Sequence, residues 1–201
     1  FFYPRRLLAP GCATVTLMKA TKILMEEHRV IERVIATLEE AAHRLAENQA
    51  VRHGLFIEAT DFIRGFADGC HHRKEEGVLF QSMAAYGVPV EGGPIGVMLS
   101  EREQARLFTR NLRQAAERLD AGDQTAKNDV ILNSLNYVML LRQHILKEDN
   151  VLFPMADKVL PPDEQDRLTD GFDHVEHEET GEGIHEKYLA LADRLAAELG
   201  E

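Results

Sequence analysis

Apolar side chains recur at helical spacing along most of this chain. In the first long segment they alternate at steps of four and three residues, at Leu24, His28, Ile31, Ile35, Leu38, Ala42 and Leu45. This spacing predicts a helix with one buried face, and Thr21 is a suitable N-cap for it. His28 is the exception, because it is a polar residue within an otherwise apolar line.

Three further long segments follow the same helical period. The second runs roughly over residues 51–85, and a loop rich in glycine and proline covers residues 86–94. The third begins near Ile95 and ends at a turn around Gly122, and the fourth spans roughly residues 126–157. Four long helices with short connections predict an all-α fold, an antiparallel four-helix bundle.

The buried lines of these helices contain charged residues where a core would be apolar. In the second segment the line is Ile63, Ala67, His71, Glu75 and Leu79. In the third it is Met98, Arg102, Ala105, Thr109, Leu112, Ala116 and Leu119. In the fourth it is Val130, Ser134, Tyr137, Leu141, His144, Glu148, Leu152 and Met155. The charged positions therefore replace core residues.

The two ends of the chain differ from this bundle. Pro161 and Pro162 stop the fourth helix, and we interpret residues 159–201 as a C-terminal helical extension packed on the bundle of residues 18–158. Residues 1–17 show no clear period, so we interpret them as an N-terminal leader or an added extension.

Composition and charge limit the kinds of partner that the protein can bind and the cellular compartment that we expect for it. The chain has 201 residues and a net charge of −11, which argues against nucleic acid or an anionic membrane as a partner. No run of residues is apolar enough to span a bilayer. The two cysteines, Cys12 and Cys70, provide no disulfide framework, so we expect a cytoplasmic protein with Cys70 as a buried thiol.

One motif occurs twice. Residues 71–80 and 144–153 both have the pattern His-x-x-Lys-Glu-acid-x-Val-Leu-Phe. Residues four apart lie on one face of a helix, so His71 adjoins Glu75. By the same rule His144 adjoins Glu148.

Paired imidazoles and carboxylates on buried faces suit iron, zinc or manganese, whereas calcium prefers oxygen ligands alone. The structural alternative is two buried His–Glu hydrogen bonds. Burying charge without a partner costs several kcal/mol, and two matched pairs favour metal over two independent structural pairs. His28, in the core line of the first helix, is then the natural further ligand.

Other polar residues are weaker candidates. His72 points about 100° away from His71 around the helix, which makes it a secondary candidate ligand. Tyr137 faces the same way as His144, either as core packing or as the lining of the metal pocket. The set His174, His177 and Glu178 shares a helical face, and we interpret it as solvated surface rather than as a second metal site.

These features resemble the hemerythrin-like proteins, also called the HHE cation-binding domain. The resemblance covers roughly residues 18–157 and rests on four stretches, at residues 26–29, 71–80, 93–98 and 144–154. It implies a four-helix bundle with a non-haem di-iron centre. Carried over, the bridging carboxylates are Glu75 and Glu148, and the terminal histidines include His28, His71 and His144.

One departure from the family concerns the third helix. Arg102 occupies its expected ligand position, and a guanidinium stays protonated and cannot bind metal. Three outcomes follow. The second metal is weakened or absent, or Glu101 or Glu103 substitutes as a ligand, or Arg102 pairs with Glu75 or Glu148 in a site with one metal or none.

The expected function is that of a hemerythrin-like non-haem iron protein, with one iron ion or two. It would bind or sense dioxygen or a related small ligand, such as nitric oxide or peroxide. The alternatives are a di-iron enzyme that consumes peroxide or repairs iron centres, and an iron storage protein. All of them use the same ligands, so the sequence leaves open whether the protein is an enzyme, and it indicates no protein partner.

Overall fold

The computed structural model describes residues 19–200, and every regular element within that range is a helix. The predicted all-α class is confirmed. The leader of residues 1–17, with Cys12, lies outside the described residues. In chain order the elements of the first four segments are α1 (Ala20–Ala46), α2 (Gly54–Phe62), η1 (Ile63–His71), α3 (His72–Lys74), η2 (Glu75–Leu79), α4 (Phe80–Ala85), α5 (Pro94–Asp120), η3 (Gln124–Ala126), α6 (Lys127–Lys147), η4 (Glu148–Leu152) and α7 (Phe153–Val159).

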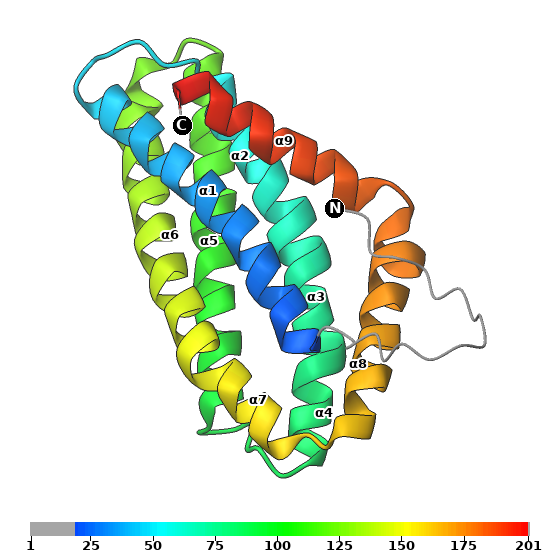
Figure 1. Ribbon diagram of the computed structural model, residues 1–201. Coiled ribbons are helices and arrows are strands. Elements are labelled where there is room, and N and C mark those ends of the chain that lie inside the picture. Colours follow the sequence, from blue (N-terminus) through cyan, green and yellow to red (C-terminus); the bar gives the residue numbers. More distant parts are fainter. Residues whose placement is uncertain (1–18, 201) are drawn as a thin grey trace.

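The first four segments pack side by side around one core. Helix α1 contacts α6, α6 contacts α5, α5 contacts α2, and α2 contacts α1 again. Short connections join the consecutive segments (Figure 1). Every buried line of the sequence therefore faces the same interior.

The interior consists of two apolar clusters. One cluster includes Ile31 of α1 and Phe66 of η1, and it extends toward the end of the molecule where α1 finishes. The other includes Leu24 and Leu79 and lies toward the opposite end. His28 lies between Ile31 and Leu24 along α1. Together with the buried His71, Glu75, Arg102, His144 and Glu148 it forms a polar layer between the two apolar clusters.

The two ligand-bearing segments contain π-helical turns that the sequence pattern did not predict. The amide of Phe80 donates to the carbonyl of Glu75, and the amide of Phe153 donates to that of Glu148, which are five-residue steps. Both copies of the motif thus begin a π-turn at their glutamate. Such turns occur frequently at functional sites.

The expected N-cap at Thr21 is wrong. Helix α1 begins at Ala20 after Lys19, and no side chain caps it. The Thr21 hydroxyl instead donates to Asp157 Oδ1 at 2.9 Å, because Thr21 faces α7 rather than the start of its own helix.

The C-terminal residues form three elements, namely α8 (Pro162–His174), η5 (Val175–Gly181) and α9 (Ile184–Leu199). Figure 1 shows α8 beside α4 and α9 lying along α1 and α2. Glycines allow close approach at both places, since a Cβ on Gly171 would lie 2.7 Å from Val78 and one on Gly65 would overlap the Tyr188 ring.

Within residues 19–200, no helix combines the length and apolar character needed to cross a membrane.

Candidate metal centre

Four buried side-chain atoms of the polar layer have no hydrogen-bond partner. They are His28 Nε2, His71 Nε2, Glu75 Oε1 and Glu148 Oε2. The four side chains can each offer a ligand atom within 4.8 Å of the others. His28 Nε2 lies 3.2 Å from Glu148 Oε2, but the pair lacks hydrogen-bond geometry. Buried polar atoms are nearly always paired, so this set calls for a bound group.

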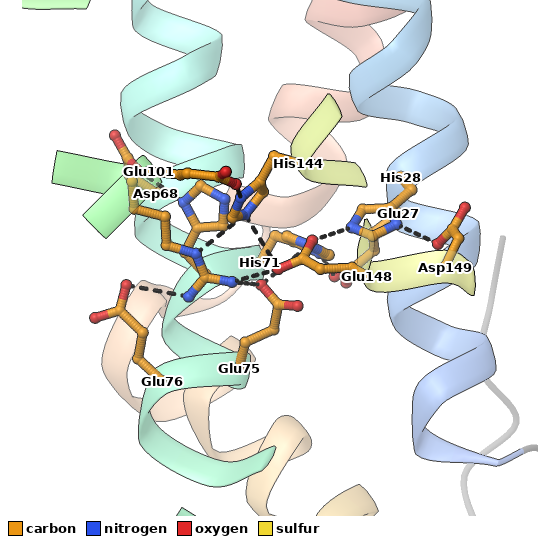
Figure 2. A network of polar contacts seen from close by, with 12 residues as sticks. Glu27, His28, Asp68, His71, Glu75, Glu76, Glu101, His144, Glu148 and Asp149 are labelled. Atoms are coloured by element: carbon orange, nitrogen blue, oxygen red, sulfur yellow. Dashed lines mark hydrogen bonds and ion pairs between the residues drawn. The ribbon is translucent and has the colours of Figure 1, made fainter. Parts of the chain in front are cut away.

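The second nitrogen of each of these histidines is already fixed by a carboxylate. His28 Nδ1 lies 2.7 Å from Asp149 Oδ1, and His71 Nδ1 lies 2.8 Å from Glu27 Oε2 (Figure 2). A carboxylate that accepts from one ring nitrogen turns the lone pair of the other toward the centre, as in carboxylate–histidine–metal sites. The orientation of both rings therefore suits a metal ion.

Arg102 lies on the other side of the two carboxylates. Its Nη2 donates to Glu75 Oε2 and, at 2.9 Å, to Glu148 Oε1. Its Nη1 lies 3.2 Å from Glu76 Oε1, and the guanidinium stacks 4.8 Å from the Phe80 ring centre. Each carboxylate thus gives one oxygen to the arginine, and its other oxygen has no hydrogen-bond partner.

His144 lies on the arginine side of the centre. Its Nδ1 lies 3.0 Å from Glu101 Oε2, which leaves Nε2 to accept from Arg102 Nε at 3.4 Å. Nε2 also lies 3.1 Å from Glu148 Oε1, so the predicted side-by-side placement of this pair is confirmed. The structure does not bring His144 into the group of four convergent ligands.

The charges of the two convergent histidines differ. Burial lowers the pKa of His71 to about 4, against the hydrogen bond to Glu27, so this imidazole is neutral at pH 7. Burial also lowers the pKa of His28, but the hydrogen bond to Asp149 and the adjacent negative charge of Glu148 outweigh it and raise that pKa to about 10. A metal ion that binds here must displace the His28 proton.

The remaining predicted site residues take other positions. Glu101 bonds to His144 and Lys147, and Glu103 is exposed and pairs with Arg106, so neither carboxylate joins the convergent group. His72 is buried, but its Nδ1 bonds to Asp68 at 2.9 Å. Tyr137 is buried in the apolar cluster that contains Ile31.

Two other features of the described residues fit a metal ion less well than the convergent group. A group of Glu27, Cys70, Glu176 and His185 has ligand-like spacing, but the Lys74 ammonium already lies 2.6 Å from a carboxylate oxygen of both Glu27 and Glu176. A surface pocket of about 440 Å³ contains none of the four convergent ligands. It is lined by Arg64, Asp68, Arg106, Thr109, Arg110, Arg113 and Gln114.

Sequence reasoning missed the residues that support the ligands, above all Glu27 and Asp149. A signal for Glu27 was present, because it begins a second buried line on α1 that continues through Ile31, Val34 and Leu38. No equivalent signal marked Asp149, since its role depends on the distance between α1 and η4.

A comparison with known protein families matches residues 19–156 to the hemerythrin HHE cation-binding domain. The chain belongs to this family. This HHE protein is similar to the uncharacterized protein Rv1995 of Mycobacterium tuberculosis and to the uncharacterized protein Mb2018 of Mycobacterium bovis. Each is 25% identical over 177 residues, which cover 88% of this chain and 68% of the relative. The family assignment supports cation binding at the polar layer.

The supporting carboxylates of this HHE domain provide a first test. Replacing Glu27 or Asp149 by alanine should weaken metal binding by about 10- to 100-fold, because each change frees the ring of a ligand histidine. Affinity can be measured by competition with a chelator. Glu26→Ala is the matched control, since Glu26 is exposed and adjoins Glu27. Equal affinity in all three variants would show that the ring orientations do not depend on these carboxylates.

Proposed function

We propose that this chain is a non-haem iron protein that holds a single iron ion between His28, His71, Glu75 and Glu148. Its task in this proposal is to bind or sense dioxygen or a related small ligand, such as nitric oxide or peroxide. The observation that carries the proposal is the convergence of four buried side chains, each with one ligand atom that has no hydrogen-bond partner. The proposal assumes that the four long helical segments form the antiparallel bundle typical of the family.

The donor set fits one ion better than two. A second ion would need the outer oxygens of Glu75 and Glu148, and both already accept from Arg102. A guanidinium at contact distance also repels a metal cation, by several kcal/mol at an effective dielectric of about 20. In addition to the single metal ion, Arg102 thus supplies positive charge that offsets the two buried carboxylates.

The donors also narrow the choice of metal. Two imidazole nitrogens and two carboxylate oxygens suit iron, manganese or zinc. Iron is proposed because the HHE family usually holds it. An iron ion with four protein ligands supplies a Lewis-acidic centre that retains coordination positions for a small ligand. The role of the protein is to exclude water, since all four ligand side chains are almost fully buried.

Peroxide turnover is a second candidate, and Arg102 favours it. Its guanidinium is fixed by Glu75, Glu148 and Phe80 beside the centre. A fixed cation stabilises negative charge that develops on oxygen during cleavage of an oxygen–oxygen bond. Iron storage has no comparable support, because the four ligands describe one small site.

The direct test is iron loading under anaerobic conditions, followed by optical spectra with dioxygen, nitric oxide or peroxide. We expect about one iron per chain, because the outer carboxylate oxygens are held by Arg102. A new, stable absorption band after addition of a ligand indicates binding, whereas evolution of oxygen from peroxide indicates turnover. Glu148→Ala should show neither signal. A native chain that retains no iron, manganese or zinc would refute the proposal.

A further inference from the structure

A chain of buried ion pairs connects the C-terminal elements to the proposed metal centre. It starts at Glu176 of η5, whose Oε2 accepts from Lys74 Nζ at 2.6 Å. Lys74 also donates to Glu27 Oε1 at 2.6 Å, and Glu27 Oε2 lies 2.8 Å from His71 Nδ1. Three contacts therefore lead from the extension to a convergent histidine.

The inner members of this chain are shielded from water, and Glu176 is partly covered. Lys74 and Glu27 are 1% and 3% exposed. Burial raises the pKa of Glu27, but Lys74 and His71 outweigh it and lower that pKa to about 2. The pKa of Glu176 is likewise lowered to about 2, where His185 and Lys74 outweigh burial. Each charge depends on its neighbour, because little water is available to replace a lost partner.

Glu176 is also held by the last helix. His185 of α9 places its Nδ1 3.3 Å from Glu176 Oε2, and Cys70 Sγ lies 3.9 Å from the same nitrogen. Residues 157–200 lie beyond the part of the chain that matches the family. The contact of Glu176 with Lys74, and the contact of His185 that holds Glu176, are thus made by residues outside the matched domain.

From this geometry we infer that Glu176 is a positioning residue for the metal ligand His71, and that docking of α8, η5 and α9 is thermodynamically linked to metal binding. The inference rests on the proposed single-ion site. Glu176 shares the Lys74 ammonium with Glu27, and Glu27 orients the His71 ring. Metal binding fixes His71 and therefore Glu27, Lys74 and Glu176 in turn. Linkage is reciprocal, so a docked extension must raise metal affinity by the factor by which metal favours docking.

Cobalt(II) is a suitable probe, since its visible spectrum reports ligand geometry and its affinity can be measured against a chelator. We expect E176Q to bind cobalt about 5-fold more weakly or worse, with a changed spectrum, and E176D to recover part of the loss. E179Q is the matched control, because Glu179 lies on the same element and makes only exposed pairs, with Arg73 and His174. Equal affinity and spectra in folded E176Q and E179Q would overturn the inference.

The second measurement uses the native chain, so its result does not depend on whether E176Q folds. Hydrogen exchange of the amides in η5 and α9 should slow when cobalt is added, by about the factor lost in E176Q. Exchange there that is unchanged by metal would overturn the inference while leaving the metal site intact. A native chain that binds no cobalt would instead refute the proposed function together with this inference.

Discussion

Alanine at Glu75 or at Glu148 should remove most of the metal bound by this protein. Each carboxylate supplies one of the four convergent atoms and also carries a charge that offsets the metal ion. Loss of an anionic ligand from a buried site leaves three donors and an uncompensated cation. We expect affinity to fall by at least about 100-fold, beyond the effect of removing a supporting carboxylate.

Elemental analysis after dialysis against a weak chelator measures this result. Glu103→Ala is the matched control, since it removes a glutamate from the neighbouring helix α5 that pairs only with Arg106. Its metal content should equal that of the native chain. Unchanged metal content in both Glu75→Ala and Glu148→Ala would reject the proposed ligand set.

Arg102→His should raise the number of iron ions per chain from about one toward two. The substitution removes the guanidinium that holds the outer oxygens of Glu75 and Glu148, and it places an imidazole on α5. Both carboxylates could then bridge two ions, as the family arrangement implies. The two buried carboxylates still have a cationic partner, because a second ion takes the place of the guanidinium.

Iron content and near-ultraviolet absorption of a coupled iron pair are the measurements. Arg106→His is the matched control, since Arg106 lies one turn further along α5 and contacts Glu76 without reaching Glu75 or Glu148. Arg102→Lys keeps the cation and should keep the native stoichiometry. Two tightly held irons in the native chain, unchanged by Arg102→His, would show that Arg102 does not replace an ion.

Much of the candidate site could be predicted from sequence because it depends on local helical geometry. His71 and Glu75 are four residues apart, and their polar atoms lie 3.4 Å apart in the structure. His28 and Arg102 interrupt apolar lines, and both are buried as those lines predicted. Of the three outcomes expected for Arg102, pairing with the carboxylates is the one that the geometry supports.

Other features of the site could not be predicted from spacing. Glu75 and Glu148 were both expected to bridge metals, yet one oxygen of each accepts from Arg102. His144 Nε2 also accepts from Arg102. Which oxygen faces which partner depends on the separation of α5 from η2 and η4, and local sequence does not encode this separation. The π-turns that begin at Glu75 and Glu148 were also missed, because the spacing of apolar residues over a single turn does not distinguish a π-turn from an α-turn.

The sequence by itself determined the helical class, the buried lines and the residues that carry the chemistry, because a period of 3.6 residues fixes which side chains share a face. Only the tertiary structure decided which carboxylate oxygens pair with Arg102 and which have no hydrogen-bond partner. It also decided that Glu176, about 100 residues from His71, ends the ion-pair chain that reaches this ligand. Such contacts depend on how separate helices pack, where burial makes each charge depend on partners that are distant in the chain.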